Sequence, residues 1–567
     1  MIIRPIYLIL IPLVLSAFTH LWNPAGYPGP DVDEGFYLGR AINFLDTLNP
    51  LDPYDGYDHP YFGQIFLAGF LYAIGYPSLL TNPSGLNYEI LLIIPRIFMG
   101  LLAVIDTLLI YKIVEMRYTK IAALLAATLF AVTPITWLTR LIVLDALELP
   151  FVLSSIFFAM LLIRQKSLNN GKNGLFILIS GILMGLSIFI KIPAFTMIPL
   201  IGYLVYRGNK KGFKFIALWL IPVLLIPMLW PLHAIILGQF SEWVDAIYWQ
   251  THRESYPLIV ALNDFFGIDS ILLIMGIFGL IYAGIKRDFF PLLFAIPLLL
   301  FEYFIGYVAV FHLLILITVL CISTAKLFAD IFSFLKKKNA ILHLSSIGLM
   351  SGILIFSVIV TTVQISLNES SQYFKAAQFV NQYLESKSNK NNTDGTTNKP
   401  TVVSHPFFFW IDKYKFKNEY NNFWDTEKFE TNEVIFIVDR IFKNVINENE
   451  YAHGSKFRNL FSAFETKHIA SFYNNPIDEN GVEVFETDLQ NYNNSKVKTE
   501  NFLDKIHMWT NTSIVKVQRQ QSMLNLTTDN TNSSNESNVN FVFPNTIFSL
   551  SGPSAYLHIS YYIPTYS

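Results

Sequence analysis

Residues 341–363 read ILHLSSIGLMSGILIFSVIVTTV, a run that contains no Asp, Glu, Lys or Arg. A helix needs about 20 mostly apolar residues to cross the hydrocarbon core of a bilayer. A stretch of this length and composition therefore predicts a membrane-spanning helix. Comparable runs recur along the chain and bring the total to about eleven candidate spans, at residues 5–22, 89–111, 121–139, 146–163, 174–190, 192–206, 215–236, 268–285, 289–305, 307–325 and 341–363.

The bulk composition agrees with a membrane protein. Of the 567 residues, 53% are hydrophobic and 14% are charged, and the mean hydropathy is +0.41. A soluble protein carries about 25% charged residues. The formal net charge of −2 gives no basic excess, which argues against a nucleic-acid partner. Because Cys321 is the only cysteine, an internal disulfide and a Cys-based metal site are both excluded.

The first apolar run, Ile6 to Leu21, has the length of either a signal peptide or a span. One basic residue, Arg4, precedes it, and no small-x-small cleavage site lies before Asn23-Pro24. Because further membrane segments follow, we interpret it as a retained first span.

The orientation follows from the basic loops, since short loops rich in Lys and Arg stay on the cytoplasmic side. With the N-terminus inside, every basic cluster falls on the inner side. Eleven crossings would then leave the C-terminal part outside the cytoplasm. The inner clusters are Lys112/Arg117/Lys120, Arg164/Lys166/Lys172, Arg207/Lys210/Lys211/Lys214, Lys286/Arg287 and Lys336/Lys337/Lys338.

Residues 65–80, IFLAGFLYAIGYPSLL, form the one ambiguous apolar stretch. Counting it as a span would invert every later loop and place all the basic clusters outside. It is short for a crossing and holds two glycines and a proline. We therefore expect an interfacial or re-entrant segment.

Composition divides the chain into a transmembrane module, residues 1–364, and an extracytoplasmic domain, residues 365–567, rich in Asn, Lys, Glu, Ser and Thr. Glycosylation acceptors must face outward. An Asn- and Ser-rich tail also creates sequons by chance, but their absence before residue 368 agrees with the basic loops. The sequons begin at Asn368, Asn391, Asn493, Asn511, Asn525, Asn532 and Asn535.

The tail has the pattern of an α/β or α+β domain. An amphipathic stretch, Ser371–Glu385, precedes a polar linker, and strand-like runs follow at 401–411 and 433–442. Residues 525–540 are of low complexity and are expected to be a loop. The alternating last stretch, 539–564, is typical of β structure.

The outer loops, residues 23–88, 140–148 and 237–267, hold most of the polar residues that packing does not explain. Pro30 and the acidic residues after it predict a helix over about 33–48. Its positions i, i+4 and i+7 share one stripe, which holds Asp33, Tyr37 and Arg40. A different stripe is apolar, a pattern typical of a helix in the membrane interface. A solvated loop helix with an acidic N-cap would give the same pattern.

Other polar groups of these loops could meet a phosphate or a sugar. His59 follows Asp58 and precedes Pro60, so the segment is either an anion contact or a turn. Asp145 and Glu148 are three residues apart at the start of a span, where charges are costly unless they face a cavity. Arg140 lies just before them. The alternative is a pair of helix ends capped by charge, against which Asp145 and Glu148 face the same way.

The late outer loop, 242–256, reads EWVDAIYWQTHRESY. Aromatic residues are expected at an interface, while His252 and Arg253 add positive charge that could hold an anionic headgroup. Lys191, at the outer junction of two short spans, is a further cation. We assign no role to Asp106, which lies inside a span.

Several motifs of other functional classes are absent from the sequence. The chain has no Walker phosphate loop, no strand-linked GxGxxG, no HExxH and no Cys/His metal cluster. Asp106 does not make the relay of charges expected of an ion-coupled transporter, and no inverted repeat with broken helices is visible.

Taken in order, these segments resemble C-type (GT-C fold) membrane glycosyltransferases. Asp33-Glu34 through Tyr37, after the first span, resembles their "DE" signature, most closely in the branch of protein O-mannosyltransferases and lipid A aminoarabinose transferases. His59-Pro60 is similar to the His/Lys-Pro-Pro element of that branch, with Tyr61 in place of the second proline. Arg140 through Asp145 is similar to its RLxxLD element.

Three later segments extend the resemblance over about residues 1–325. Gly185-Leu186 through Lys191 is similar to a GL…TKGP stretch, although the sequence here reads IKIP. Trp249 to Arg253 resembles an aromatic-His motif of the late loop, and His312 is similar to a histidine at the outer end of a late span. The tail lacks a WWDYG-type signature, which disfavours the oligosaccharyltransferase branch.

The resemblance implies a polyprenyl-phosphate-sugar-dependent glycosyltransferase that transfers its sugar with inversion to a hydroxyl of a protein, lipid or glycan. Asp33 would be the general base, Glu34 would belong to the catalytic pair, and Asp145 would place the acceptor or a metal. No cofactor is certain, and a divalent metal stays open. The residues expected to bind substrate are Tyr37, Arg40, His59, Arg140, Glu148, Lys191, His252 and Arg253.

Two alternatives remain open from the sequence. A flippase or transporter predicts paired charges near the bilayer midplane, and a membrane anchor for a binding tail predicts that Asp33 and Asp145 are dispensable. A further alternative is an enzyme that transfers an oligosaccharide rather than a single sugar. The size of the sugar on the donor would distinguish these two activities.

Overall fold

A computed structural model describes residues 5–51, 56–81, 88–164, 170–208, 212–253, 256–394, 400–404, 406–411, 414, 416, 433–439, 467–473 and 481–488. The helices before the tail are α1 (Pro5–Leu21), α2 (Val32–Thr47), α3 (Phe62–Ala73), α4 (Ser78–Thr81), α5 (Tyr88–Arg117), α6 (Lys120–Val132), η1 (Pro134–Arg140), α7 (Leu144–Arg164), α8 (Asn170–Ile190), η2 (Ile192–Met197), α9 (Ile198–Gly208), α10 (Gly212–Leu225), α11 (Leu229–Ile236), α12 (Phe240–Thr251), α13 (Leu258–Ile285), α14 (Phe289–Ile305), η3 (Val310–Leu313), α15 (Leu314–Lys338) and α16 (Ala340–Ile365). The tail adds α17 (Ser371–Asp394), β1 (Thr401–Ser404), η4 (Pro406–Phe408), α18 (Phe409–Ile411), β2 (Glu433–Asp439), β3 (Lys467–Tyr473) and β4 (Gly481–Asp488).

The prediction of a multi-span helical membrane protein is confirmed. In the described chain, 6 helices are long and apolar enough to cross a membrane, and up to 8 if each bent pair is one span. Each segment expected to span is helical here, and the one expected at 192–206 is divided between η2 and α9. The expected spans that fall below the length criterion are the shorter helices α1, α9 and α14.

Two of the expected spans are sharply bent. α6 and η1 meet at 70°, and α10 and α11 meet at 41°. Proline explains both breaks, because its ring clashes with a preceding carbonyl and it has no N–H to donate. Pro134 opens η1, and Pro227 lies between α10 and α11.

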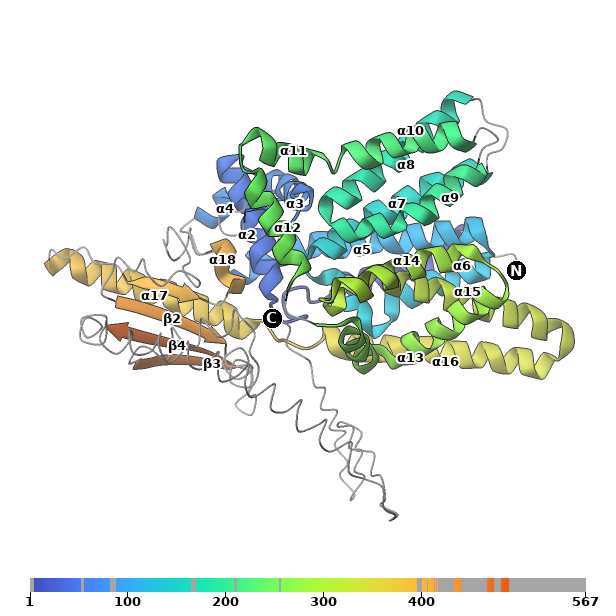
Figure 1. The fold of residues 1–567 in the computed structure, drawn as a ribbon. Coiled ribbons are helices and arrows are strands. Elements are labelled where there is room, and N and C mark those ends of the chain that lie inside the picture. Colours follow the sequence, from blue (N-terminus) through green and yellow to red (C-terminus); the bar gives the residue numbers. More distant parts are fainter. Residues whose placement is uncertain are drawn as a thin grey trace, which may run out of the picture.

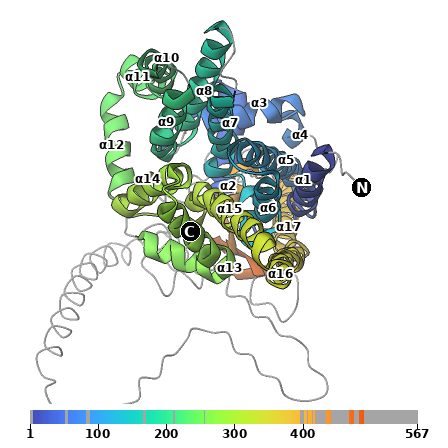
Figure 2. The same ribbon diagram turned by 90° about the vertical axis from the view of Figure 1, so that its right-hand side faces the viewer.

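The long helices form one bundle whose two ends differ (Figure 1). One end holds the start of α1 and the C-terminal ends of α5, α9, α13 and α15, where basic clusters were expected. The other end holds α2, α3, α12 and the tail, with α2 and α12 running across the bundle axis. Figure 2 shows the bundle end-on, with α15 in its interior and α16 at its edge. Burial of the residues agrees with this view: 83% of the apolar window of the span that contains α15 is buried inside the protein, compared with 17% for α16.

The ambiguous stretch 65–80 does not form a long helix. It falls within α3, of 12 residues, and α4, of 4 residues. Twelve residues of helix extend about 18 Å, which is less than the hydrocarbon core of about 30 Å. Gly75, with φ of +98°, takes a left-handed conformation between the two helices that suits glycine. The geometry therefore fits an interfacial segment.

The described part of the tail combines helix and sheet. Four strands lie in the order β1-β2-β4-β3, with β1 parallel to β2 and the other pairs antiparallel. The strand-like run 401–411 forms β1 and then turns into η4 and α18. The run 433–442 forms β2 as far as Asp439. The loop expected at 525–540 and the β structure expected at 539–564 lie outside the described residues.

Candidate active site

The helix that carries Asp33 begins at a capping box. The Asp31 carboxylate accepts the backbone N–H of Asp33 at 2.9 Å, and the Glu34 carboxylate accepts the backbone N–H of Asp31 at 3.1 Å. This reciprocal pairing satisfies N–H groups that a helix start leaves without partners. The helix expected over 33–48 is found at Val32–Thr47.

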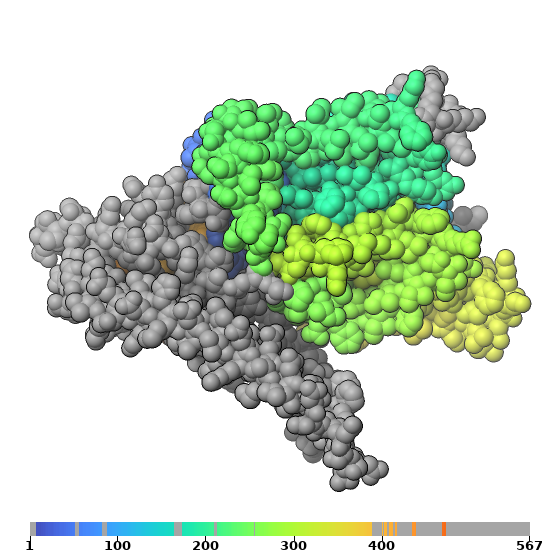
Figure 3. Space-filling model, in the orientation of Figure 1, coloured from blue at the N-terminus to red at the C-terminus, as the bar shows by residue number. Residues whose placement is uncertain are grey.

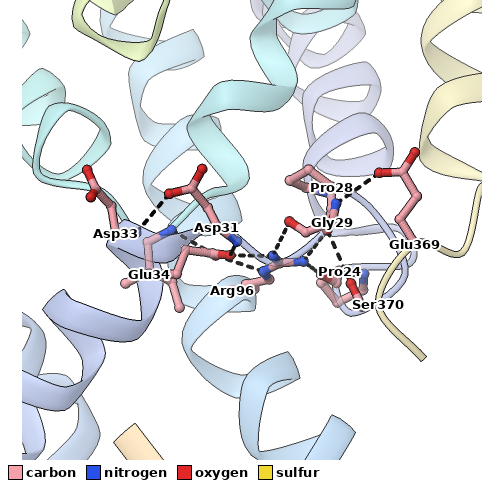
Figure 4. Close-up of polar contacts among 10 residues, drawn as sticks. Pro24, Pro28, Gly29, Asp31, Asp33, Glu34, Arg96, Glu369 and Ser370 are labelled. Carbon is pink, nitrogen blue, oxygen red and sulfur yellow. Dashed lines mark hydrogen bonds and ion pairs between the residues drawn. The ribbon is translucent and has the colours of Figure 1, made fainter. Parts of the chain in front are cut away.

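Glu34 is fully buried, and its carboxylate is bound by protein donors. Arg96 of α5 donates from Nε to Oε1 at 2.9 Å and from Nη2 to Oε2 at 2.5 Å. The backbone N–H of Ile142 donates to Oε1 at 3.1 Å. A bidentate charged pair fixes both distance and orientation. Figure 4 shows Glu34 directed at Arg96 and Asp33 pointing away from it, so neighbouring residues of the acidic motif have different surroundings.

Arg96 also fixes the loop that leads into α2 (Figure 4). Its Nη1 donates to the carbonyls of Pro24 at 3.0 Å and Pro28 at 2.7 Å, and its Nη2 donates to that of Gly29 at 3.1 Å. With the two bonds to Glu34, all five guanidinium N–H groups are used. The Gly29 N–H donates in turn to the Glu369 carboxylate at 3.1 Å, which ties the loop to the start of the tail.

Arg140 lies at the junction of α1 and the same loop. It is 1% exposed, and its Nη2 donates to the backbone carbonyls of Trp22 at 2.5 Å and Asn23 at 2.9 Å. The sequence suggested a phosphate contact for this cation. Its described hydrogen bonds are with the backbone rather than with the groups around Asp33.

A chain of charges runs along the polar stripe of α2. Arg40 Nη2 pairs with Asp58 Oδ2 at 2.9 Å, and His59 Nδ1 lies 2.8 Å from the same oxygen. Burial would raise the pKa of the Asp58 carboxyl, but the charges of Arg40 and His59 hold that pKa below its usual value. The His59 ring stands edge-on to Tyr37, with centroids 6.1 Å apart. Helix α2 and the loop after it therefore share one polar network.

Tyr37 is buried, and the charges of three of the acids act on it. Burial raises the pKa of its phenol well above the usual value, and the negative charges of Asp33, Asp58 and Asp145 raise it further, while Arg40 lowers it. Asp33 and Asp145 are far apart along the chain, yet both act on this one hydroxyl. The two carboxylates expected to share a pocket therefore lie in one neighbourhood.

The α7 side of the neighbourhood is built around an ion pair. Lys191 Nζ lies 2.6 Å from Asp145 Oδ2, and both side chains are nearly buried. The ammonium also lies 5.5 Å from the centre of the Phe311 ring, a favourable cation–π position. The carboxylates of Glu148 and Glu302 interact electrostatically with this pair. The positive charge of Lys191 therefore acts on three carboxylates, those of Asp145, Glu148 and Glu302.

The late outer loop contributes Arg253 but leaves His252 at the surface. The Arg253 guanidinium lies 4.4 Å from the ring centre of Trp249 and 4.8 Å from that of Tyr307. His312 is partly buried and interacts electrostatically with Arg253. His252 stacks on Tyr248 with centroids 3.9 Å apart and is exposed.

His312 interacts with positively charged side chains from both parts of the site. His312 interacts electrostatically with Lys191 and His59 as well as with Arg253. They come from the junction of α8 and η2, the loop before α3 and the segment after α12. The expected residues that the structure groups here are Asp33, Tyr37, Arg40, His59, Asp145, Glu148, Lys191 and Arg253.

The structure adds residues that the sequence reasoning missed: Arg96, Asp58 as the bridge between two cations, and Glu302. Arg96 and Glu302 lie inside apolar runs that were expected to span the membrane. Charged side chains are rare and costly inside a membrane span. A charge within an apolar run was therefore the signal in the sequence that could have identified both residues. The partners of Arg96, in contrast, come from segments far away in the sequence.

The expectation of a metal stays open. Among the described residues, no three His, Cys, Asp or Glu side chains come together as a metal site would require. The Asp145 carboxylate is engaged by Lys191. Asp145, which was expected to place the acceptor or a metal, is thus paired with a cation of the protein.

A polar cavity of about 380 Å³ lies beside the second half of α2. Amide and hydroxyl side chains predominate in its lining, and Tyr57 donates to Gln239 at 2.9 Å across it. Asn43, at its edge, is ten residues beyond Asp33, which is about 15 Å along the helix. The lining residues are Asn43, Thr47, Asn49, Leu51, Gly56, Tyr57, Gln239 and Glu242.

Comparison with known proteins agrees with this geometry. The family model of dolichyl-phosphate-mannose-protein mannosyltransferases matches residues 92–233. That range covers α6, α7 and η2, and with them Asp145 and Lys191. No curated protein matches the chain in sequence.

Solved structures extend the likeness to most of the chain. The oligosaccharyltransferase AglB of Archaeoglobus fulgidus, solved with an inhibitory peptide and a dolichol-phosphate, is 12% identical with a TM-score of 0.52, and the match covers 84% of this chain and 74% of that one. ArnT of Cupriavidus metallidurans, bound to undecaprenyl phosphate, is 12% identical with a TM-score of 0.54, covering 85% and 97%. At these identities the likeness establishes the fold.

The fold expected from the acidic motif and the outer loops is therefore confirmed. The sequence match over 92–233 supplies the class of enzyme, and the solved structures supply the architecture. Together they identify the chain as a membrane glycosyltransferase of the GT-C fold.

Proposed function

We propose that the protein transfers a sugar from a polyprenyl-phosphate carrier to a hydroxyl acceptor on the outer face of the membrane, with inversion at the anomeric carbon. What supports this proposal is the geometry of two charged groups. Arg40, on the α2 stripe that also holds Asp33 and Tyr37, pairs with Asp58 at 2.9 Å, and Lys191 pairs with Asp145 at 2.6 Å. The charge of Asp145 also acts on Tyr37. This neighbourhood lies at the end of the bundle opposite the basic helix ends (Figure 1). The positive-inside rule puts those basic ends in the cytoplasm.

A lipid-linked donor suits a site that faces outward, because nucleotide sugars are cytoplasmic. Structures of the same fold hold a dolichol-phosphate and undecaprenyl phosphate. In this chain Arg40, His59 and Lys191 supply the positive charge that a departing phosphate needs. Fixed cations placed where negative charge develops are usually the largest catalytic contribution.

The surface around the site is suited to a lipid substrate. Helix α12 crosses the end of the bundle and, with α11, is prominent on the face shown in Figure 3. Large apolar side chains of both helices are exposed, among them Ile236 at 72% and Tyr248 at 62%. An apolar surface next to fixed cations suits a polyprenyl chain with a phosphate head.

Asp33 fits the role of general base. It lies at the first turn of α2, it is only partly buried, and within the described contacts no side chain donates to its carboxylate. As the acceptor oxygen attacks the anomeric carbon, its proton passes to Asp33. The bond between that carbon and the phosphate oxygen breaks, and the electron pair leaves on the phosphate. A positioned base contributes about 10²–10⁴ in rate.

The other acids of the motif have supporting roles in this proposal. Glu34 holds α2 in place through Arg96, so we assign it to positioning rather than to proton transfer. Asp145 orients Lys191, and through that pairing it places a cation near the anomeric phosphate. Arg140 stabilises the loop before α2 through the Nη2 bonds to the carbonyls of Trp22 and Asn23.

The test replaces Asp33 with Asn in the full chain. Sugar transfer is assayed with a panel of polyprenyl-phosphate hexoses after membrane insertion has been confirmed. Because the amide cannot accept the proton, the rate should fall by about 10²–10⁴, with little change in donor affinity. Asp245→Asn is the matched control, since Asp245 is an exposed carboxylate on α12 outside the site. Full activity in the Asp33→Asn variant would remove Asp33 from this role.

A further inference from the structure

One segment of the tail lies directly against the helix that carries the proposed base. Elements η4 and α18 pack against α2, and Figure 1 shows α18 beside that helix. Phe407 is fully buried, and Trp410 is 2% exposed. Both residues belong to the same continuous core as Leu38 and Ala41 of α2. The docked segment, residues 406–411 together with Tyr414, is thus part of the core around α2.

The contacts follow a single stripe of α2. The Phe36 and Phe409 rings meet edge to face, with centroids 4.8 Å apart and planes at 84°. One turn further, a β-carbon added to Gly39 would lie 3.6 Å from the backbone nitrogen of Trp410. Two turns beyond that, the Tyr414 hydroxyl donates to the Asp46 carboxylate.

These contacts continue into the proposed site. The Arg40 guanidinium lies 5.9 Å from the centre of the Phe36 ring and 5.5 Å from that of Tyr37. The same guanidinium pairs with Asp58, which in turn pairs with His59. An unbroken series of contacts thus runs from Phe409, through Phe36 and Arg40, to the cations of the site.

We propose that Phe409 and the docked segment of residues 406–411 and Tyr414 position the active site: they hold Phe36, and through it Arg40, in the geometry that meets the departing phosphate. This inference rests on the proposed function above and adds the tail to the catalytic unit. Misplacing a catalytic group by about 1 Å costs on the order of 10²-fold in rate. Phe409 is a positioning residue, because it touches neither substrate nor the reacting atoms.

The experiment compares Phe409→Ala with Phe379→Ala in the full-length protein. Phe379 is also a tail aromatic ring, but it stacks on Tyr383 within α17 rather than on α2. In Phe409→Ala, amide hydrogen exchange over residues 36–46 should rise at least tenfold, and kcat should fall about tenfold with donor KM unchanged. In Phe379→Ala, both quantities should stay within about twofold of the wild type. Should Phe409→Ala fail to fold, Phe36→Leu removes the same ring contact from the α2 side.

A double-mutant cycle separates positioning from general destabilisation. If Phe409 acts through Arg40, the effects of Phe409→Ala and Arg40→Lys on kcat will combine to less than their product. Independent effects would multiply, and that result would overturn the proposal. Unchanged exchange over residues 36–46 in Phe409→Ala would also overturn it. An Asp33→Asn variant with full activity would instead count against the proposed function, while the exchange comparison would still decide the docking.

Discussion

At the residue scale, Asp58 shows how one carboxylate organises two cations. It faces Arg40 on α2 and its own neighbour His59, and its side chain is 12% exposed. Breaking a mostly buried charged pair leaves the remaining charges without compensation. Asp58 therefore determines where both side chains lie.

Asp58→Asn should destabilise the protein by about 2 kcal/mol at neutral pH. Pairing lowers the folded pKa of Asp58, so its contribution is present above the ordinary carboxyl value of about 3.9 and is lost as pH falls below it. Thermal unfolding in detergent between about pH 7 and about pH 3 checks this. The difference between wild type and variant should shrink toward acid pH. An unchanged difference would mean that the pair does not contribute.

The local part of this site could be predicted from the sequence, and the long-range part could not. The helix at Val32–Thr47 follows from acidic residues and hydrophobic spacing within one segment. The partners of Glu34 do not, because Arg96 is 62 residues away and lies in an apolar run. Likewise, the spacing of Asp145 suggested a cavity, but only the fold pairs it with Lys191. Local patterns specify helices, whereas pairings between distant side chains depend on packing.

At the element scale, α2 is held at both ends. Arg96 fixes its first turn and the loop before it (Figure 4), and Tyr414 contacts Asp46 near its last turn. Helix α2 lies across the bundle rather than within it (Figure 1), so neighbouring spans alone do not fix it. These anchors let a short helix place Asp33 reproducibly.

Arg96→Lys should destabilise the protein by about 3–5 kcal/mol, because lysine cannot bridge both Glu34 oxygens and leaves buried carbonyls without donors. Thermal unfolding in detergent measures the loss. Arg117→Lys is the matched control. Arg117 pairs with Asp288 at 2.6 Å, but its side chain is 36% exposed, and exposed pairs contribute at most about 1 kcal/mol. Equal losses in both variants would show that Arg96 is no special anchor.

At the scale of the whole molecule, the two ends of the bundle are occupied by different parts of the chain. The tail and the proposed site occupy one end, and the basic helix ends occupy the other (Figure 1). The alternation of long helices between these ends follows from hydrophobic runs that the sequence shows directly. The bends at 70° and 41° and the transverse course of α2 and α12 depend on how helices pack, so the sequence indicates only their proline breaks.

The orientation in the membrane can be read with single cysteines, because Cys321 is the only native thiol and is buried. In a Cys321→Ser background, Gln378→Cys on α17 and Lys337→Cys on α15 place one exposed thiol at each end of the bundle. If the basic ends face the cytoplasm, an impermeant maleimide added to intact cells should label the first variant and not the second. Detergent should expose both thiols equally. The opposite labelling would put the proposed site in the cytoplasm, where nucleotide sugars are present, and the argument for a lipid-linked donor would fail.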